Sequence, residues 1–224
     1  MQQTCLLCGQ YHSAQFALCH GCQQDLPWLG AHCLRCAQPL SIAGSTCGLC
    51  LQNNPIQQRT LALFDYHFPI TPLIQQLKNN RPLLLADLFG KLLVSAVKTT
   101  YEGDSLPQAL IPIPLHRKRL SQRGHNPSAL IGFFAEQQLK IPCLHQVCKR
   151  IKNTPPQRGL NHEQRQKNLR NAFQLQQIDA LKGITHIALL DDVVTTGATT
   201  QALAQVLKPH VERIDIWCVA RTSL

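Results

Sequence analysis

The sequence predicts an α/β protein in which a parallel sheet with flanking helices follows a small cysteine-rich module. Eight of the eleven cysteines lie before residue 51. Beyond residue 58, apolar runs alternate with amphipathic helical patterns, which is typical of a parallel sheet with helical crossovers. One apolar run, residues 187–190, ends in two adjacent carboxylates and is followed by small residues and another helical pattern. These three observations set the fold class.

Length and hydropathy indicate a chain that folds in water. At 224 residues it can bury a substantial core. Residues 1–10 lack the basic flank and the long apolar stretch of a secretory signal. The longest apolar region, residues 83–97, is interrupted by Asp87, Gly90 and Lys91, so no membrane span is expected. We therefore expect a cytoplasmic protein.

The N-terminal cysteines form four C-x-x-C pairs, with ten residues between each pair and the next. Two such pairs supply the four thiolates of a tetrahedral zinc site, and disulfides are disfavoured in a reducing compartment. The repeat therefore predicts two structural zinc ions. Sequential and interleaved groupings of the pairs are both compatible with the spacing. The expected ligands are Cys5, Cys8, Cys19, Cys22, Cys33, Cys36, Cys47 and Cys50.

The cysteine-rich segment is predicted to be a domain of its own. Residues 51–58, LQNNPIQQ, have linker composition, which gives a zinc-binding module at 1–58 and a second domain at 59–224. The module has only Asp25 and Arg35 as full charges, so its zinc-bound thiolates would leave it about four units negative. It is therefore not an electrostatic DNA clamp. We expect its aromatic residues to form a small core rather than to stack on bases; they are Tyr11, Phe16 and Trp28.

The second domain reads as alternating strands and helices. Its last strand and helix enclose the acid pair and the loop of small residues, which places both at the carboxyl end of a strand. Strands are expected at 61–68, 109–115, 143–151, 187–190 and 213–220, helices at 72–79, 82–98, 127–139 and from 202, and polar loops at 116–126 and 152–173.

The stretch from Asp191 to Thr200 has the chemistry of a phosphate and diol site. A loop of threonine, glycine and alanine lets backbone N–H groups point inward, and the helix that follows adds its unpaired N–H groups and the positive end of its dipole. The carboxylates of Asp191 and Asp192 can accept hydrogen bonds from two adjacent hydroxyls. The stretch therefore predicts a binding site for a phosphorylated diol.

Positive charge is concentrated in one region. Residues 116–170 contain twelve Lys or Arg and two acids, so they carry the whole net charge of +10 of the chain. An excess this concentrated indicates a polyanionic partner, either a pyrophosphate-bearing small molecule or nucleic acid.

Several segments resemble known proteins. LLDDVVTTGATT, residues 189–200, resembles the ribose-phosphate signature of the type I phosphoribosyltransferases. FDYHFPITPLIQQLKNNRPLLLADLFGKLL, IPIPLHRKRLSQRGHNPSAL and RIKNTPPQRGLNHEQRQKNLRNAF, together with the cysteine pairs, resemble the ComF family. These are competence-associated, phosphoribosyltransferase-like proteins that often carry an N-terminal zinc module. The resemblance covers essentially the whole chain and implies a type I phosphoribosyltransferase-like sheet.

The resemblance also implies roles for individual residues. Asp191 and Asp192 would hold the ribose hydroxyls of phosphoribosyl pyrophosphate, with Mg²⁺ bridging its pyrophosphate and ribose, and would be the catalytic pair in an active enzyme. The loop at 152–170 would close over the site. The 5′-phosphate would be bound by Thr195, Thr196, Gly197, Ala198 and Thr199, and the pyrophosphate would face Arg117, Arg119 and Arg123. Val193, Gln157 and Arg165 would also contribute to binding of the ligand.

Three functions follow from the resemblance and the charge. The first is a competence protein of natural transformation that binds a phosphoribosyl pyrophosphate-type ligand and handles single-stranded DNA in the cytoplasm. The second is an active phosphoribosyltransferase with an unidentified acceptor. The third is an adaptor whose zinc module recruits a helicase or other competence proteins of the uptake machinery. Binding residues alone do not establish turnover, because folds and sites are reused.

Overall fold

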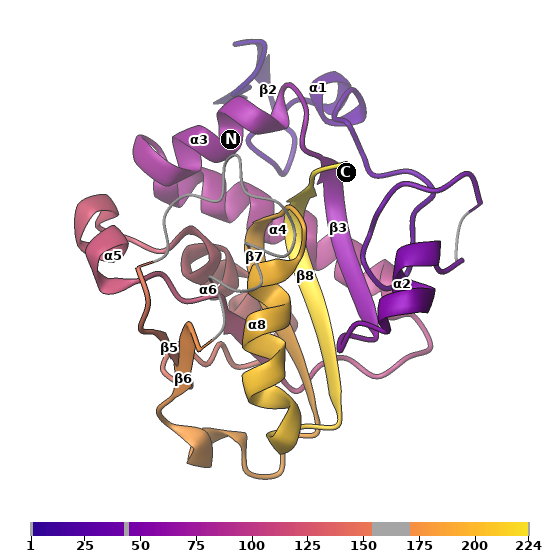
Figure 1. Cartoon of the computed structure of the whole chain (residues 1–224). Coiled ribbons are helices and arrows are strands. Elements are labelled where there is room, and N and C mark those ends of the chain that lie inside the picture. The colour runs from indigo at the N-terminus through magenta and orange to yellow at the C-terminus, as the bar shows by residue number, and fades with distance from the viewer. Residues whose placement is uncertain (1, 43–44, 154–170, 224) are drawn as a thin grey trace.

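A computed structural model describes residues 2–42, 45–153 and 171–223. Its centre is a four-stranded parallel sheet in the order β3-β8-β7-β4 (Figure 1). The sheet confirms the predicted α/β class, and β3 and β4 form its edges. The strands are β3 (Arg59–Asp65), β4 (Ala109–Pro112), β7 (His186–Val194) and β8 (Arg213–Arg221).

Helices cover both faces of the sheet. On one face lie α3 (Ile70–Asn79), α4 (Pro82–Thr100) and α6 (Pro127–Leu139), and on the other lies α8 (Ala198–Leu207). Successive side chains of a strand point to opposite faces, so β7 sends Ala188 to the α4 side and Leu189 to the α8 side. This burial on both faces explains the unbroken apolar run of β7.

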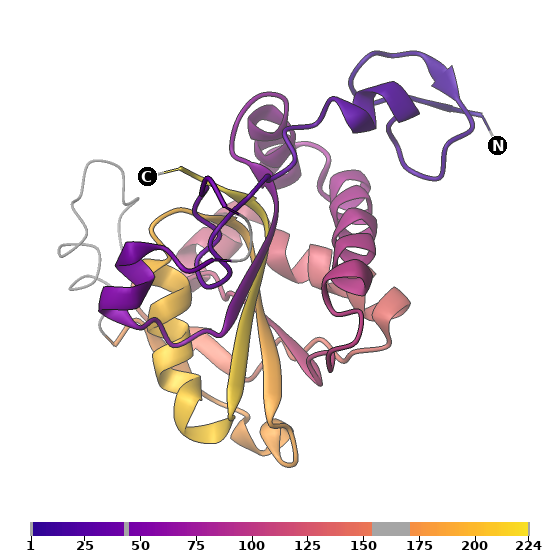
Figure 2. The ribbon, with the colours of Figure 1, turned by 90° about the vertical axis from the view of Figure 1, so that its right-hand side faces the viewer.

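The cysteine-rich segment folds as two zinc units on either side of β3. The first zinc unit, residues 2–26, projects away from the sheet in Figure 2, but its Leu18 and Leu26 join the core on the α4 side. The second zinc unit, residues 27–58, places Ala37 in the core on the α8 side. The short elements of these units are β1 (Gln3–Thr4), β2 (Tyr11–His12), α1 (His20–Gln24) and α2 (Gly48–Asn53).

The second zinc unit is hydrogen-bonded to the outer edge of β3. Leu29 N donates to Leu63 O at 2.9 Å, and Asp65 N donates to Pro27 O at 2.9 Å. Further along, Thr60 N donates to Leu34 O at 2.8 Å. Residues 27–34 therefore protect the edge of the sheet that would otherwise be open to other strands. The linker expected at 51–58 is helical over its first three residues, because α2 extends to Asn53.

Two of the expected secondary-structure assignments are wrong. The loop expected at 116–126 contains helix α5 (Arg117–Arg123), which His116 caps by accepting the N–H of Lys118 and which Gly124 ends with φ 79°. The strand expected at 143–151 is reduced to β5 (Cys148–Arg150), which pairs antiparallel with β6 (Phe173–Leu175). A turn at 145–146 interrupts the segment after residue 143.

Four other elements form close to their predicted positions, whereas β7 continues four residues beyond the expected strand and α8 begins four residues before the expected helix. Helix α6 has the predicted bounds, and α3, α4 and β8 differ by one or two residues at an end. Tyr11 is exposed and Trp28 is half-exposed, so the expected aromatic core forms only around Phe16. A 3₁₀ turn precedes each of the last two strands: η1 (Ile178–Leu181) before β7 and η2 (Lys208–His210) before β8. Within the described residues, no helix combines the length and the apolar character that crossing a membrane requires.

Candidate functional site

The eight N-terminal cysteines gather into two groups of four. Within each group the sulfur atoms lie within 4.8 Å of one another, as the ligands of a single ion must. The groups follow the chain, so the structure selects the sequential grouping over the interleaved one. Four thiolates complete a tetrahedral zinc shell and leave no open position, so both sites are structural. One group is Cys5, Cys8, Cys19 and Cys22, and the other is Cys33, Cys36, Cys47 and Cys50.

The acid pair lies where β7 extends beyond the end of the neighbouring strand β4. The last residue of β4, Pro112, pairs with Leu190, so the next two residues of β7 extend past that edge. On the other side, Asp191 still pairs with Cys218 of β8. Asp191 and Asp192 therefore stand at the carboxyl edge of the sheet, which is where open parallel sheets bind ligands.

Backbone and side-chain contacts hold the two carboxylates in place. Oδ1 of Asp191 accepts from Asp192 N at 2.9 Å and from Ser128 Oγ, at the start of α6, at 3.2 Å. Oδ1 of Asp192 accepts from Val193 N at 2.9 Å. Oδ2 of Asp192 forms an ion pair of 2.7 Å with Lys78 Nζ, from the last turn of α3. The pair is thus tied to helices α3 and α6.

Asp191 has an unusual electrostatic environment. Burial and the neighbouring charge of Asp192 raise the pKa of Asp191 to about 8, although Lys78 opposes this rise. Arg150, at the end of β5, lies within electrostatic reach. Burial and Arg119 lower the pKa of Arg150, whereas Asp191 raises it. The site therefore combines an acid that holds its proton near neutral pH with two nearby cations, Lys78 and Arg150.

The loop after β7 leads directly into the N-terminus of α8. Gly197 has φ 76°, a conformation that favours glycine, and it caps α8. Thr200 Oγ1 donates to Gly197 O at 2.8 Å, and Thr196 Oγ1 accepts from Ala198 N at 3.4 Å. The helix of ten residues begins at Ala198, so its first N–H groups and its positive dipole end lie at this loop. Val193, Thr195 and Thr199 complete the segment.

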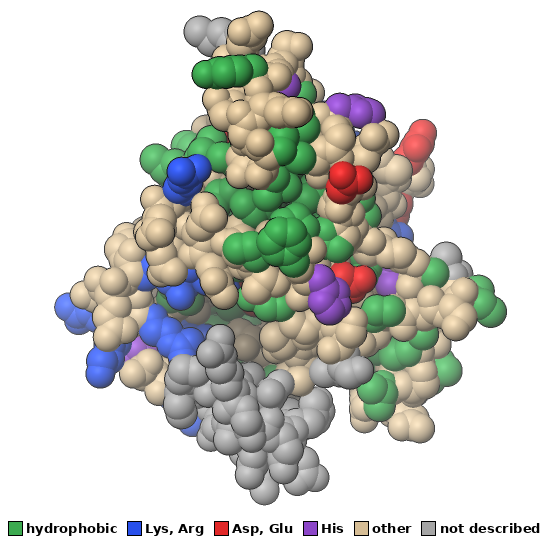
Figure 3. Space-filling view, turned by 90° about the horizontal axis from the view of Figure 1, so that it is seen from above, with side chains coloured by type: hydrophobic (Ala, Val, Ile, Leu, Met, Phe, Trp, Pro, Cys, Tyr) green, Lys and Arg blue, Asp and Glu red, His purple; other side chains and the backbone are tan. Residues whose placement is uncertain are grey.

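Helix α5 separates the three arginines that the sequence grouped together. Arg119 and Arg123 are one helical turn apart and half-buried, whereas Arg117 is exposed. Figure 3 shows Lys and Arg side chains gathered at the left, on the side of α5, next to a hollow in the surface. Gln157 and Arg165 lie outside the described residues, so their expected roles remain predictions.

Sequence reasoning missed several residues of this site. Lys78 had the position of a solvated helix-end lysine, and its partner Asp192 lies far along the chain. Ser128 and Asn126 are part of the start of α6, where Asn126 Oδ1 accepts from Ser128 N at 3.2 Å. Asn126 Nδ2 also donates to Ile113 O at 3.0 Å. Only the Asn-Pro start of α6 could have suggested this cap.

Fold and sites together define an α/β protein with a parallel sheet, a pair of four-cysteine zinc sites and two adjacent carboxylates at the carboxyl edge of the sheet. Residues 2–51 match the family model of the double zinc ribbon domain. The chain is 34% identical to competence protein F of Haemophilus influenzae over 97% of its own length and 96% of that protein.

Other relatives carry a second name. The DNA utilization protein YhgH of Shigella flexneri is 35% identical, and that of Escherichia coli K12 is 34% identical. Each alignment covers 76% of this chain and 75% of the relative. The chain belongs to the competence protein F family.

Proposed function

We propose that this protein takes part in DNA uptake, where it binds a ribose phosphate of the phosphoribosyl pyrophosphate type and handles single-stranded DNA. The names of its relatives, competence protein F and DNA utilization protein, support the cellular role. A type I phosphoribosyltransferase-like domain at 59–224, preceded by the zinc module at 1–58, is the architecture that this proposal assumes.

One observation supports this ligand. Asp191 and Asp192 lie near the end of β7, two residues before a loop that ends in Gly197 and leads into helix α8. Two acceptors next to an anion-binding helix start suit a molecule with adjacent hydroxyls and a phosphate, and a ribose 5-phosphate has both. The hydroxyls would bind the acids, and the phosphate would bind the N–H groups between Thr195 and Thr199.

The cations suit the pyrophosphate of the ligand. Arg119 and Arg123 share one side of α5, and Arg150 is within electrostatic reach of both Arg119 and Asp191, which links this side of α5 to the acid pair. Arg117 is exposed and would meet only an extended polyanion. The oxygen donors of Asp191 and Asp192 fit Mg²⁺, which would neutralise phosphate charge when bound with the ligand.

Calorimetry with phosphoribosyl pyrophosphate and Mg²⁺ tests the pocket. We expect saturable binding to the wild type and at least a tenfold loss in Asp191→Ala/Asp192→Ala, because both hydroxyl anchors are removed. Lack of binding to the wild type would refute the ligand. Unchanged binding to the double variant would refute the assignment of the acids.

The DNA part of the proposal rests on the basic region. Helix α5 presents exposed Arg117 and Lys118, and Lys149 is exposed on the neighbouring β5. Electrostatic binding of a single strand releases counterions, so the affinity should fall steeply as salt rises. Titration of labelled oligothymidylate at several salt concentrations measures this slope. A strand that does not bind even at low salt contradicts the role.

A second candidate is an active transferase, and the raised pKa of Asp191 favours it. A carboxyl group that titrates near neutral pH is suited to proton transfer to or from an acceptor. Pyrophosphate release from phosphoribosyl pyrophosphate, measured against a panel of nucleobases and amines, tests this function. Release that the Asp191→Asn variant abolishes supports turnover, and release no faster than without protein excludes it for that panel.

A further inference from the structure

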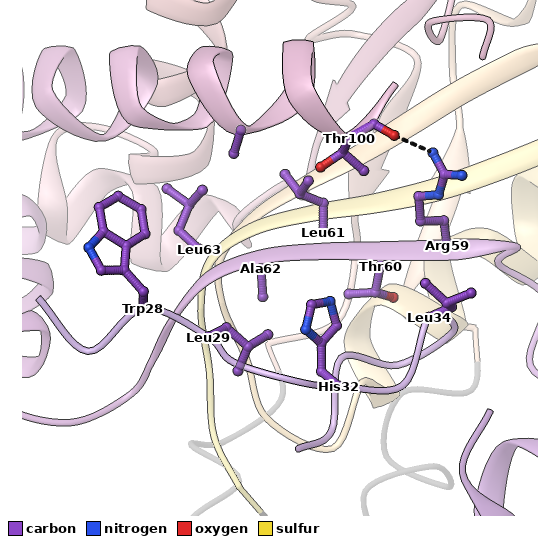
Figure 4. Close-up of a pocket in the computed structure, with 11 residues that line it drawn as sticks. Trp28, Leu29, His32, Leu34, Arg59, Thr60, Leu61, Ala62, Leu63 and Thr100 are labelled. Atoms are coloured by element: carbon purple, nitrogen blue, oxygen red, sulfur yellow. Dashed lines mark hydrogen bonds between the residues drawn. The ribbon is translucent and has the colours of Figure 1, made fainter. Parts of the chain in front are cut away.

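A groove lies far from the acid pair, at the seam between the second zinc unit and the sheet. Its volume is about 320 Å³, which is in the range of small-ligand pockets. In Figure 4, β3 runs between α4, which contributes Ala96 and Thr100, and residues 29–34. Trp28, Leu63, Leu61 and Arg59 lie on the α4 side of the strand, and His32 lies on the other side. Most of the lining is apolar, and neither the zinc sites nor the ribose-phosphate pocket uses it.

An exposed tryptophan closes one end of the groove. Trp28 is 41% exposed, yet its ring is held in place. Its Nε1 donates to Gln23 O at 2.9 Å, and its ring centroid lies 4.6 Å from that of Phe64. Figure 4 shows Leu63 and Leu61 lying in a row from Trp28 toward Arg59. A fixed aromatic ring beside apolar side chains provides a stacking surface. Because the fold already holds the ring in place, little conformational entropy is lost when a ligand binds.

Polar groups occupy the rest of the lining. The guanidinium group of Arg59 contacts Asp104 Oδ2 at 3.4 Å and Thr100 O at 3.4 Å, which fixes it at the far end. Arginine has five N–H donors, so these contacts leave donors for a ligand. Trp28 packs against Phe64, five residues along β3 from Arg59, which is roughly 16 Å in an extended strand. A guanidinium group at that distance suits a phosphate of the same DNA strand and not the base that Trp28 stacks.

We propose that this groove binds a nucleobase stacked on Trp28, with the attached sugar-phosphate chain running along β3 toward Arg59. The base would come from a DNA single strand or from a free nucleotide. The inference rests on the DNA-handling part of the proposed function and gives it a specific site. It does not depend on the ribose-phosphate pocket.

The seam is poorly suited to an added peptide strand. A peptide would need the open edge of β3, but residues 27–34 already bond to that edge at both ends of the groove. Helix α5, in contrast, supplies charge without a flat ring, since it contains no aromatic residue. Charge and stacking would therefore be supplied by separate surfaces, with phosphates bound near α5 and a base bound at Trp28.

Tryptophan fluorescence gives a direct test on the full-length protein. The chain has two tryptophans, and Trp217 is 0% exposed, so quenching by a bound base reports Trp28. We expect short oligothymidylate to quench the emission and an abasic strand of equal length to leave it unchanged. Thymidine monophosphate, titrated alone, identifies the source: quenching at a similar concentration indicates a free nucleotide, and much weaker quenching indicates a strand.

Variants separate stacking from folding. Trp28→Ala should weaken oligothymidylate binding between about fivefold and about 150-fold. Trp28→Phe keeps a ring for packing and should lose the fluorescence change while retaining most binding. Ala96→Leu fills the groove from α4 without touching Trp28 and should also weaken binding, whereas Ser95→Leu, exposed on the same helix, should not.

Anisotropy of a labelled strand distinguishes the two ways of failing. If the strand binds but leaves Trp28 emission unchanged, or if the abasic strand quenches equally, the groove assignment is wrong and the DNA-handling proposal stands. If the strand does not bind at any salt concentration, both are wrong.

Discussion

Lys78 Nζ lies 2.7 Å from Asp192 Oδ2, and this ion pair joins the end of α3 to the carboxyl edge of the sheet. The side chains of Lys78 and Asp192 are 25% and 12% exposed, so both are largely withdrawn from water. The end of α3 is also held by His125, from the segment between α5 and α6, because His125 Nε2 lies 2.9 Å from the carbonyl oxygen of Leu77, the residue before Lys78. The fold thus holds a cation against the acid pair before any ligand arrives.

Lys78→Gln should destabilise the protein by about 1–3 kcal/mol, because Asp192 is left largely buried without its counter-charge. Lys91→Gln is the matched control. Its ion pair with Asp87 spans one helical turn and is more exposed, at 30% and 31%, so its loss should cost less than about 1 kcal/mol. Urea unfolding of both variants measures the difference, and equal losses would contradict the account.

The stability contribution of Asp191 should fall as pH rises. Its carboxyl group releases a proton near pH 4 in the unfolded chain, as an ordinary aspartate does, but only at about 8 in the fold. Between these values the folded state holds more protons, so rising pH favours unfolding by up to about 1.4 kcal/mol per pH unit. Asp191→Asn should make the urea midpoint of unfolding depend less on pH across this window. Asp179→Asn, at an exposed ion pair, should not.

The two zinc sites should differ in their effect on the sheet. Cys19 and Cys47 both precede a short helix, so Cys19→Ser and Cys47→Ser are matched changes. Among the residues that the structure describes, it is the second zinc unit that hydrogen-bonds to β3, so Cys47→Ser should lower the hydrogen-exchange protection of Thr60 and Asp65 more. A comparable loss of protection in both variants would show that the hydrogen bonds between the second zinc unit and β3 contribute little to the stability of this edge. A deletion that tests partner recruitment should therefore end near residue 26, which keeps the edge of β3 covered.

The opposite end of the sheet has a buried polar network that should matter for stability alone. Asp215 is fully buried and accepts from Tyr101 Oη at 2.7 Å, with His186 Nε2 at 2.9 Å and Arg213 Nη2 at 3.1 Å. Burial raises the pKa of Asp215, but the hydrogen bonds from His186 and Tyr101 outweigh this and lower it overall. Asp215→Ala should cost about 3–5 kcal/mol in thermal unfolding. Ligand affinity, measured well below the unfolding transition, should stay unchanged.

The sequence was sufficient for features whose signal is local. The cysteine pairs, the run into Asp191 and Asp192, and the bounds of α6 each follow from neighbouring residues, and the structure places them as expected. The grouping of the cysteines needed the fold, because both arrangements satisfy the spacing.

Features that depend on distant partners were not predictable from the sequence. Lys78 pairs with a residue on another strand, and the bonds between residues 27–34 and β3 are made by backbone atoms, which any sequence provides. Helix α5 was missed for a local reason. Its cap is His116 instead of the usual Ser, Thr, Asp or Asn, and its basic composition resembled a loop. Gly124 was the one available stop signal.

We propose above that Asp191 and Asp192 bind the hydroxyls of a ribose phosphate. Calorimetry with ribose 5-phosphate and 2-deoxyribose 5-phosphate tests it most directly, since the two ligands share the phosphate and differ in one hydroxyl. We predict that the deoxy sugar binds at least tenfold more weakly, because a carboxylate oxygen loses its partner. Asp191→Ala/Asp192→Ala should bind both weakly and alike. Equal affinity of the wild type for the two sugars would contradict the claim.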